Sequence, residues 1–173
     1  MDWVIRAFAQ VSQINPGARL LLVGSGPELP RLTALRDSLG LADVCVFVPG
    51  RPDVADWLRM MDIYINSSYS ESFPNGLLEA MACGCCVIGS RVGGIPELVT
   101  NRENGLTFDS DKIEELTEAL RQVVIDPALR QTFKDKALET ARERFSMRIN
   151  LQRTEALYDE VLQKRKMNLR SPA

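Results

Sequence analysis

The sequence predicts an α/β fold, in which a doubly wound parallel sheet is flanked by helices and followed by further C-terminal helices. Short apolar runs typical of buried strands alternate with helix-length segments from Arg19 to Phe108. Gly and Pro residues mark most of the junctions between them. Parallel strands need crossover connections, which are right-handed in almost all proteins, so helices are expected on both faces of the sheet.

Composition narrows the class of protein. The chain has 173 residues, 45% of them hydrophobic and 25% charged, as expected for one globular domain with a real core. A net charge of -2 gives no basic field that would favour nucleic acid as a partner. No apolar run approaches the roughly 20 residues of a membrane span, and the N-terminus lacks the pattern of a signal peptide. The chain has no histidine, so the commonest catalytic base is absent.

The first part of the chain contains a glycine turn directly after a strand. Predicted elements, in order, are a helix over 3–11, a strand over 19–23, a helix ending near 39, a strand over 44–48, a short helix over 54–60 and a strand over 63–65. Gly24-Ser25-Gly26-Pro27 follows the first strand, an arrangement that lets backbone approach a phosphate. The full GxGxxG pattern is absent, so a plain tight turn is an equally good interpretation.

The segment over 71–96 organises the chain, because it carries two carboxylates eight positions apart, Glu71 and Glu79. Glu79 lies in an apolar run, where a desolvated carboxylate would need hydrogen-bond donors. The alternative is that Glu79 lies on the solvent face of its helix. Our hypothesis is that Glu79 accepts hydrogen bonds from a sugar diol and that Glu71 accepts them from a second sugar.

A turn that enters a helix lies between the two glutamates. Pro74 suits the first turn of a helix, where its missing N–H costs nothing. Unpaired amides near Asn75, Gly76 and Leu77 are then expected to form an anion site at the positive end of the helix dipole.

The second part of the chain is predicted to be mostly helical. Gly84 ends the central helix and a strand over 85–88 follows, then a turn at Gly93-Gly94, a short helical piece from Glu97 and a strand over 106–108. Helices are predicted to about 125, over 128–143 and over 147–166, the first of them capped by Asp109, Ser110 or Asp111.

Three of the four cysteines lie in Cys83-Gly84-Cys85-Cys86, and the fourth is Cys45. The run lacks the paired CxxC spacing of a zinc site. We therefore interpret them as small buried side chains in a reduced cytosol, with a redox or metal role as the minor alternative.

Four features of the sequence each follow a strand: the Gly24 turn, Arg51, Glu71 and the Gly93 turn. Ligands of parallel sheets bind outside the carboxyl ends of the strands, where the strand order reverses. We therefore expect the four to meet along one edge, although Arg51 alone would pass as a surface charge.

Taken together, these residues resemble the nucleotide-sugar-binding half of retaining glycosyltransferases of the GT-B type, family 4 (glycosyl transferases group 1). The matching stretches, in the family's order, are LLLVGSGP, VFVPGRPDV, MDIYINSSYSESFPNGLLEAMACGCCVIGS, VGGIPELV and NGLTF. Glu71 and Glu79 match the E-x7-E signature of that family. Cys86 departs from it, because it stands where the family commonly has Pro.

The resemblance implies roles for individual residues. Glu71 would be catalytic and contact hydroxyls of the transferred sugar, Glu79 would hold the nucleotide ribose, and Arg51 would lie at the base. The implied donor-binding residues are Gly24, Ser25, Gly26, Arg51, Glu71, Phe73, Pro74, Asn75, Gly76, Leu77 and Glu79.

The resemblance also implies the organisation of the protein. Residues 1–145 would be a Rossmann-like domain, one half of a GT-B fold, without its first strand, and 146–173 a C-terminal helix and tail. The whole protein would be a hexosyltransferase of glycan biosynthesis that uses a UDP- or GDP-sugar and neither a metal nor another cofactor. Its acceptor domain and the basic pair of the first strand would be missing here, which would leave an inactive fragment. The enzyme would be cytoplasmic, with membrane contact at the inner face through the missing half.

Two other functions remain open at this point. Another GT-B enzyme, such as a nucleotide-sugar epimerase or a phosphorylase-like protein, is one; epimerases usually use histidines in this region, and none is present. A non-catalytic interaction module on an α/β scaffold is the other, and it would leave Glu79 unexplained.

Overall fold

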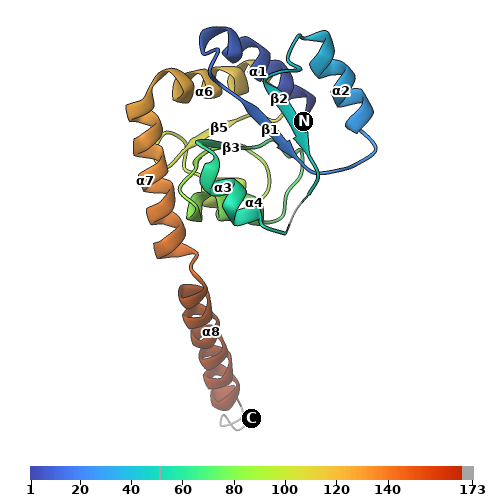
Figure 1. The fold of residues 1–173 in the computed structure, drawn as a ribbon. Helices are drawn as coiled ribbons and strands as arrows, with labels where there is room; N and C mark the ends of the chain where they lie inside the picture. The colour runs from blue at the N-terminus through green and yellow to red at the C-terminus, as the bar shows by residue number, and fades with distance from the viewer. Residues whose placement is uncertain (51, 169–173) are drawn as a thin grey trace.

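The computed structural model describes residues 1–50 and 52–168, with side chains up to residue 165. Arg51, predicted to lie in the site, therefore falls outside the described residues. The elements in chain order are α1 (Asp2–Ile14), β1 (Leu20–Val23), α2 (Leu29–Ser38), β2 (Cys45–Val48), α3 (Val54–Met60), β3 (Ile63–Asn66), α4 (Asn75–Ala82), β4 (Cys86–Ser90), α5 (Ile95–Leu98), β5 (Leu106–Phe108), α6 (Ile113–Ile125), α7 (Pro127–Arg144) and α8 (Met147–Asn168) (Figure 1).

All strand pairs are parallel, as predicted, but they form two sheets. β1 pairs with β2, and β3, β4 and β5 pair in that order. Leu20 lies opposite Cys45 in the first sheet, and Ile63 opposite Cys86 in the second. β1 and β3 do not pair with each other, so the expected single sheet is divided between them.

Helices cover both faces of the larger sheet, which confirms the doubly wound α/β prediction. Alternate residues of a strand point to opposite faces. Cys86 and Ile88 of β4 pack in one cluster with α1 and α6, whereas Val87 packs in another with α4, α5 and α7. Every residue of β4 is buried, as is typical of a central parallel strand.

Helix α1 joins the two sheets. Its residues Val4 and Ala7 belong to the cluster formed with β4, β5 and α6. Ile5 and Phe8 belong to a separate cluster with β1, β2 and α2. A helix with apolar residues on two sides can pack against two partners, so α1 holds the smaller sheet to the larger one.

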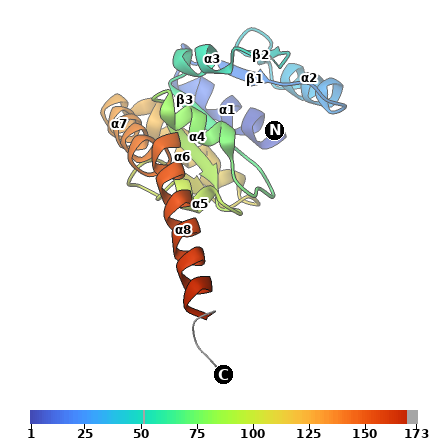
Figure 2. The ribbon, with the colours of Figure 1, turned by 90° about the horizontal axis from the view of Figure 1, so that it is seen from below.

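The last helix extends away from the body of the protein in both views (Figures 1 and 2). Its apolar side chains are exposed; examples are Leu157, Val161 and Leu162. Within the part of the chain that the structure describes, no helix is both long and apolar enough to cross a bilayer.

The start of α6 differs from the prediction. The residue that precedes it is Lys112, and no side-chain cap is recorded there. Asp109 instead pairs with Arg91 at 2.7 Å and with Lys112 at 2.7 Å. Cations recruited from elsewhere in the fold thus compete with the helix amides for this carboxylate.

The cysteines behave as buried side chains, as predicted from the sequence. Cys45, Cys85 and Cys86 are buried, Cys83 is half-buried, and all four are free thiols. Burial raises the pKa of Cys85 to about 11 and that of Cys86 to about 12, because a thiolate is poorly solvated there.

These pKa values predict selective alkylation. Because the thiolate is the reactive form, iodoacetamide at pH 8 is expected to label Cys83 in the folded protein and to leave Cys85 and Cys86 intact. Mass spectrometry of tryptic peptides measures this, and labelling in urea, where all four cysteines should react, is the control. Comparable labelling of Cys83 and Cys86 in the folded state would contradict the assignment.

Candidate functional site

Glu71, Glu79 and Tyr64 gather at one corner of the larger sheet. Burial raises the pKa of Tyr64, and the negative charges of Glu79 and Glu71 raise it further. Both carboxylates therefore act on one phenol, although they come from different segments. A Cβ built on Gly76 would lie 2.8 Å from the Tyr64 hydroxyl, so the phenol rests against the first turn of α4. A side chain at position 76 would displace the phenol from this position.

Glu79 points to solvent. Leu77, Ala80 and Met81 form the buried face of α4, whereas Asn75 and Glu79, one turn apart, are exposed. Among the described residues, no protein donor is recorded for the Glu79 carboxylate, so water solvates it instead. The solvent-face alternative describes its position. That a sugar diol donates hydrogen bonds to Glu79 stays a prediction. An exposed, uncommitted carboxylate remains available to hydroxyl groups of a ligand.

The Gly93-Gly94 turn holds the backbone of the Glu71 loop. The Gly94 N–H donates to the Glu71 carbonyl at 3.2 Å. Gly93 has a φ of 50°, and a Cβ on it would lie 1.5 Å from the same carbonyl oxygen. A Cβ on Gly94 would lie 2.4 Å from the carbonyl oxygen of Ser72. The close approach that these glycines permit is thus to another loop of the protein.

The first turn of α4 is only partly open to an anion. Pro74 directly precedes the helix, which begins at Asn75. The Asn75 N–H donates to the Phe73 carbonyl at 3.0 Å, and the Leu77 N–H to the Pro74 carbonyl at 3.0 Å. Of the three amides predicted to be unpaired, the structure leaves Gly76 without a recorded backbone acceptor within the described chain. The amides of Asn75 and Leu77 already donate hydrogen bonds within the tight turn at Pro74.

The Phe73 ring ties this loop to the end of α7. Its centroid lies 6.2 Å from that of Phe145, which follows α7. The ring is still 40% exposed, so it can also contact a ligand.

The Gly24–Gly26 turn lies at the carboxyl end of β1, in the smaller sheet. The Gly24 N–H donates to the Val48 carbonyl at 2.8 Å, and a Cβ on Gly24 or Gly26 would meet nothing within 4 Å. The turn is exposed, which leaves its backbone accessible. Within the described ranges, no hydrogen bond or ion pair is recorded between it and the Glu71 loop. The Gly93 turn meets the Glu71 loop as predicted. The Gly24 turn follows a strand of the other sheet, and its approach to Glu71 stays a prediction.

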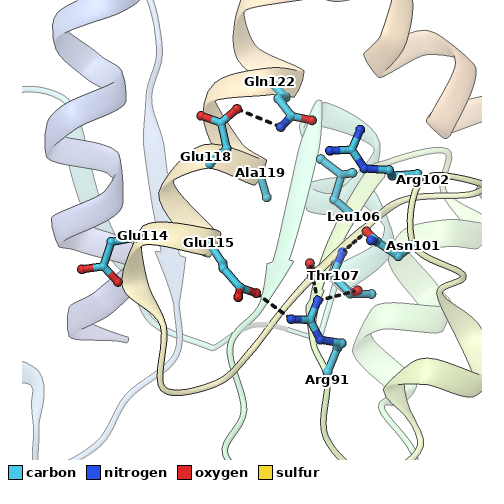
Figure 3. Close-up of a pocket in the computed structure, with 10 residues that line it drawn as sticks. All are labelled: Arg91, Asn101, Arg102, Leu106, Thr107, Glu114, Glu115, Glu118, Ala119 and Gln122. Carbon is cyan, nitrogen blue, oxygen red and sulfur yellow. Dashed lines mark hydrogen bonds and ion pairs between the residues drawn. The ribbon is translucent and has the colours of Figure 1, made fainter.

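Arg91, the cation that follows β4, forms ion pairs with carboxylates outside the Glu71 corner. Arg91 pairs with Asp109 at 2.7 Å and with Glu115 at 2.6 Å. Arg91 and Glu115 border a pocket of about 370 Å³ between α6 and the segment before β5 (Figure 3). The pocket includes neither Glu71 nor Glu79. Its Glu118 accepts hydrogen bonds from Arg121 and Gln122, which lower the pKa of Glu118 to about 2. We interpret it as a depression stabilised by local ion pairs.

Metal ligands do not converge in the described chain. It has no histidine, and no group of three Cys, Asp or Glu side chains there could hold a metal ion. That the site works without a metal or another cofactor stays a prediction.

Comparison with known proteins identifies the family. Residues 1–140 match the family model described as glycosyl transferases group 1. The chain belongs to this family.

Curated relatives agree. The chain is 35% identical over 160 residues to N-acetyl-alpha-D-glucosaminyl L-malate synthase of Bacillus anthracis. The match covers 92% of this chain and 42% of the relative. It is 36% identical over 168 residues to D-inositol 3-phosphate glycosyltransferase of Kribbella flavida. This match covers 91% of this chain and 39% of the relative. The chain thus spans about two fifths of the length of these relatives.

Solved structures share the fold. Anabaena Alr3699/HepE, in complex with UDP and glucose, superposes with a TM-score of 0.82 at 28% identity, covering 91% of this chain and 44% of that one. The C-terminal domain of the group 1 protein LpcC from Francisella tularensis has a TM-score of 0.79 at 22% identity, covering 84% of this chain and 79% of that one. The predicted family and the Rossmann-like half of a GT-B fold are confirmed.

Sequence reasoning missed Tyr64. Its apolar strand, IYIN, offered only one signal, a tyrosine shortly before the carboxyl end of a strand that leads to Glu71. A buried phenol usually needs a polar neighbour, and such a residue near a strand end merits inspection.

Replacement of Gly93 tests the support of the Glu71 loop. Gly93→Ala is expected to lower the free energy of unfolding by about 2–4 kcal/mol, because its Cβ would overlap the Glu71 carbonyl and its φ is positive. Urea denaturation followed by circular dichroism measures the loss. Gly50→Ala, where a Cβ meets nothing within 4 Å, is the matched control and should change stability by roughly 0.5 kcal/mol or less. Equal stability of the two variants would refute the contact.

Titration of Tyr64 tests whether the Glu79 carboxylate lies near its phenol. Glu79→Gln removes a negative charge that favours the neutral phenol, so the pKa of Tyr64 should fall. Ultraviolet difference spectra measure the ionisation, and Tyr64→Phe assigns it among the three tyrosines. Glu139→Gln, on α7, controls for a change in net charge. An unaltered Tyr64 titration in Glu79→Gln would place that glutamate elsewhere.

Proposed function

We propose that this chain is the donor-binding part of a retaining glycosyltransferase that takes a UDP- or GDP-sugar. The observation that carries the proposal is the corner formed by Glu71 and Glu79, two carboxylates without recorded protein partners in the described chain, beside the Tyr64 phenol. Membership of the glycosyl transferases group 1 family supports a sugar transfer. A relative of similar fold, Alr3699/HepE, binds UDP and glucose.

Each carboxylate has a role that its position suits. Glu79 is exposed on the solvent side of α4 and accepts hydrogen bonds from the ribose diol. Glu71 is half-buried in a loop with a fixed backbone, and it accepts bonds from hydroxyls of the transferred sugar. A carboxylate that accepts two hydroxyl donors in a defined geometry selects a vicinal diol, and such charge-assisted bonds are the stronger kind.

The diphosphate lies, in this proposal, at the start of α4. The Gly76 N–H and the positive end of the helix dipole face it, with the backbone near Phe73 and Leu77 alongside. In the same proposal, Gly24, Ser25 and Gly26 line its other side, and Arg51, which is outside the described residues, contacts the nucleobase. The bond between the sugar C1 and the diphosphate oxygen breaks, and a bond from C1 to the acceptor hydroxyl oxygen forms with the same configuration. The hydroxyl proton passes to the departing diphosphate. Stabilising the negative charge of the departing diphosphate is then the main catalytic demand.

The whole protein's properties follow as part of the proposal. It is a hexosyltransferase of glycan biosynthesis, active without a metal, in which another part of the protein supplies the acceptor site. It works in the cytoplasm and contacts the inner face of a membrane through that other part. The 173-residue chain by itself binds donor weakly and transfers no sugar.

Removal of the Glu79 carboxylate tests donor binding. Glu79→Ala is expected to weaken binding of a nucleotide sugar by roughly 10- to 100-fold, because hydrogen bonds to a charged group contribute about 1.5–3 kcal/mol. Titration of UDP-glucose, GDP-mannose and ADP-glucose against labelled chain, followed by NMR chemical shifts, detects affinities as weak as millimolar.

Glu139→Ala is the matched control, because it removes an exposed glutamate from a helix far along the chain. Equal donor affinity in the two variants would refute the role of Glu79. If none of the three nucleotide sugars shifts a resonance of the unsubstituted chain, the non-catalytic module becomes the better explanation.

A further inference from the structure

Tyr69 presents an aromatic ring to solvent two residues before Glu71. The residue is 65% exposed, although its side chain is large and mostly apolar. Its ring has one aromatic neighbour, Trp3, whose centroid lies 6.0 Å away at an interplanar angle of 80°. Edge-to-face pairs of this kind are favourable, and this one leaves much of the Tyr69 ring open to solvent.

Trp3 anchors the pair to the core of the protein. It lies in the first turn of α1, is half-buried, and packs against the core cluster that α1 and α6 form with the larger sheet. Its position restrains the Tyr69 ring from one side. A restrained ring loses less conformational entropy when a ligand covers it, so it is better prepared for binding. We call Trp3 and Tyr69 the aromatic platform.

The backbone on both sides of Tyr69 is also held. The Ser90 hydroxyl donates to the Ser68 carbonyl at 2.7 Å, one residue before the tyrosine. The Gly94 N–H donates to the Glu71 carbonyl at 3.2 Å, two residues after it. Tyr69 therefore lies between two tethered residues of one short loop, and the backbone keeps it close to Glu71.

The aromatic platform and the carboxylates lie toward opposite faces of the larger sheet, near the carboxyl end of β3. Trp3 packs with Ile63 in the cluster on the α1 face. Tyr64 packs in the cluster on the α4 face, and the charges of Glu79 and Glu71 help to raise its pKa. Ligands of parallel sheets bind outside the carboxyl ends of the strands. A ligand at this end of β3 is therefore open to contact from both sides.

The two sides together suit the chemistry of a pyranose ring. A hexopyranose carries hydroxyl groups around its rim and C–H groups on its faces. Carboxylates accept hydrogen bonds from the hydroxyl groups. The face of an aromatic ring carries partial negative charge, so it attracts the C–H groups and shields them from water. A phosphate has no such apolar face. A nucleobase has one, but in the proposed donor complex the ribose at Glu79 and the diphosphate separate the base from Glu71.

We propose that Tyr69, supported by Trp3, stacks on the apolar face of the transferred sugar and so selects a hexopyranose at Glu71. This inference rests on the proposed donor-binding function and adds to it a residue that contacts the sugar and not the nucleotide. Glu71 accepts hydrogen bonds from the rim of the sugar while Tyr69 covers one face. Two different kinds of contact then fix the orientation of the ring.

Comparison of a nucleotide sugar with its free nucleotide tests this role. Tyr69→Ala is expected to weaken binding of UDP-glucose or GDP-mannose by roughly 3- to 10-fold, the factor that a favourable aromatic contact supplies, and to leave the affinity for UDP or GDP unchanged. Tyr69→Phe keeps the ring and should restore most of the lost affinity. Tyr158→Ala, which removes a tyrosine that is 67% exposed on α8, is the matched control. NMR titration of each variant measures the affinities.

A direct readout separates stacking from a structural effect of the substitution. In the unsubstituted chain, nuclear Overhauser effects are expected between the ring protons of Tyr69 and the C–H protons of the bound sugar. The indole resonance of Trp3 should shift more with the nucleotide sugar than with the nucleotide. If Tyr69→Ala weakens both ligands equally, or neither of them, the proposal is overturned.

Failure of this inference and failure of the proposed function give different results. If Glu79→Ala weakens donor binding and Tyr69→Ala does not, the stacking role alone is refuted. If neither nucleotide sugar shifts a resonance of the unsubstituted chain, the donor site is refuted, and the stacking role with it.

Discussion

The backbone contact between the Gly93-Gly94 turn and the Glu71 loop is the constraint on which the candidate site depends. Two loops that follow neighbouring strands, β3 and β4, meet there without any side chain between them. The Ser90 hydroxyl donates to the Ser68 carbonyl at 2.7 Å and fastens the same two loops nearer the sheet. Because both contacts involve backbone carbonyls, the register of the two strands sets the position of Glu71. A side chain in place of either glycine would overlap a backbone carbonyl oxygen of that loop and displace it.

Electrostatics at this corner favour hydroxyl groups over phosphate. Two carboxylates lie near one phenol, and Arg91, the described cation that follows β4, is engaged by Asp109 and Glu115. The helix dipole and one amide of α4 offer only partial positive charge. A diphosphate carries at least two negative charges, so the larger part of its stabilisation must come from outside this corner. In the proposed donor complex, the two carboxylates would therefore contact the sugar and the ribose, and groups outside this corner would supply most of the charge that stabilises the diphosphate.

The sequence could predict those structural features that neighbouring residues determine, and it could not predict those that depend on contacts between distant segments. Apolar runs predicted the strands, because burial on both faces requires them, and the glycines of the Gly93 turn marked a close backbone approach. The sequence left the exposure of Glu79 open, and the structure places it on the solvent side because its apolar neighbours in sequence point to other sides of α4. Asp109 was expected to cap a helix, but Arg91, distant in sequence, binds it instead. Tyr64 and the division of the sheet both arise from pairing between distant segments, which no local pattern reports.

Apolar packing, and not strand pairing, holds the two sheets together. Helix α1 contributes apolar side chains to the core of each sheet, so hydrophobic burial joins the two sheets without a ladder of hydrogen bonds between them. Water can solvate the outer backbone groups of β1 and β3 at little net cost. Leu20 of β1 also packs against the core clusters of both sheets, so α1 is not the sole link between them. Side-chain packing is a weaker constraint on distance than strand pairing, whose hydrogen bonds fix a spacing of about 4.8 Å. The position of the Gly24 turn relative to the larger sheet is accordingly set by apolar packing.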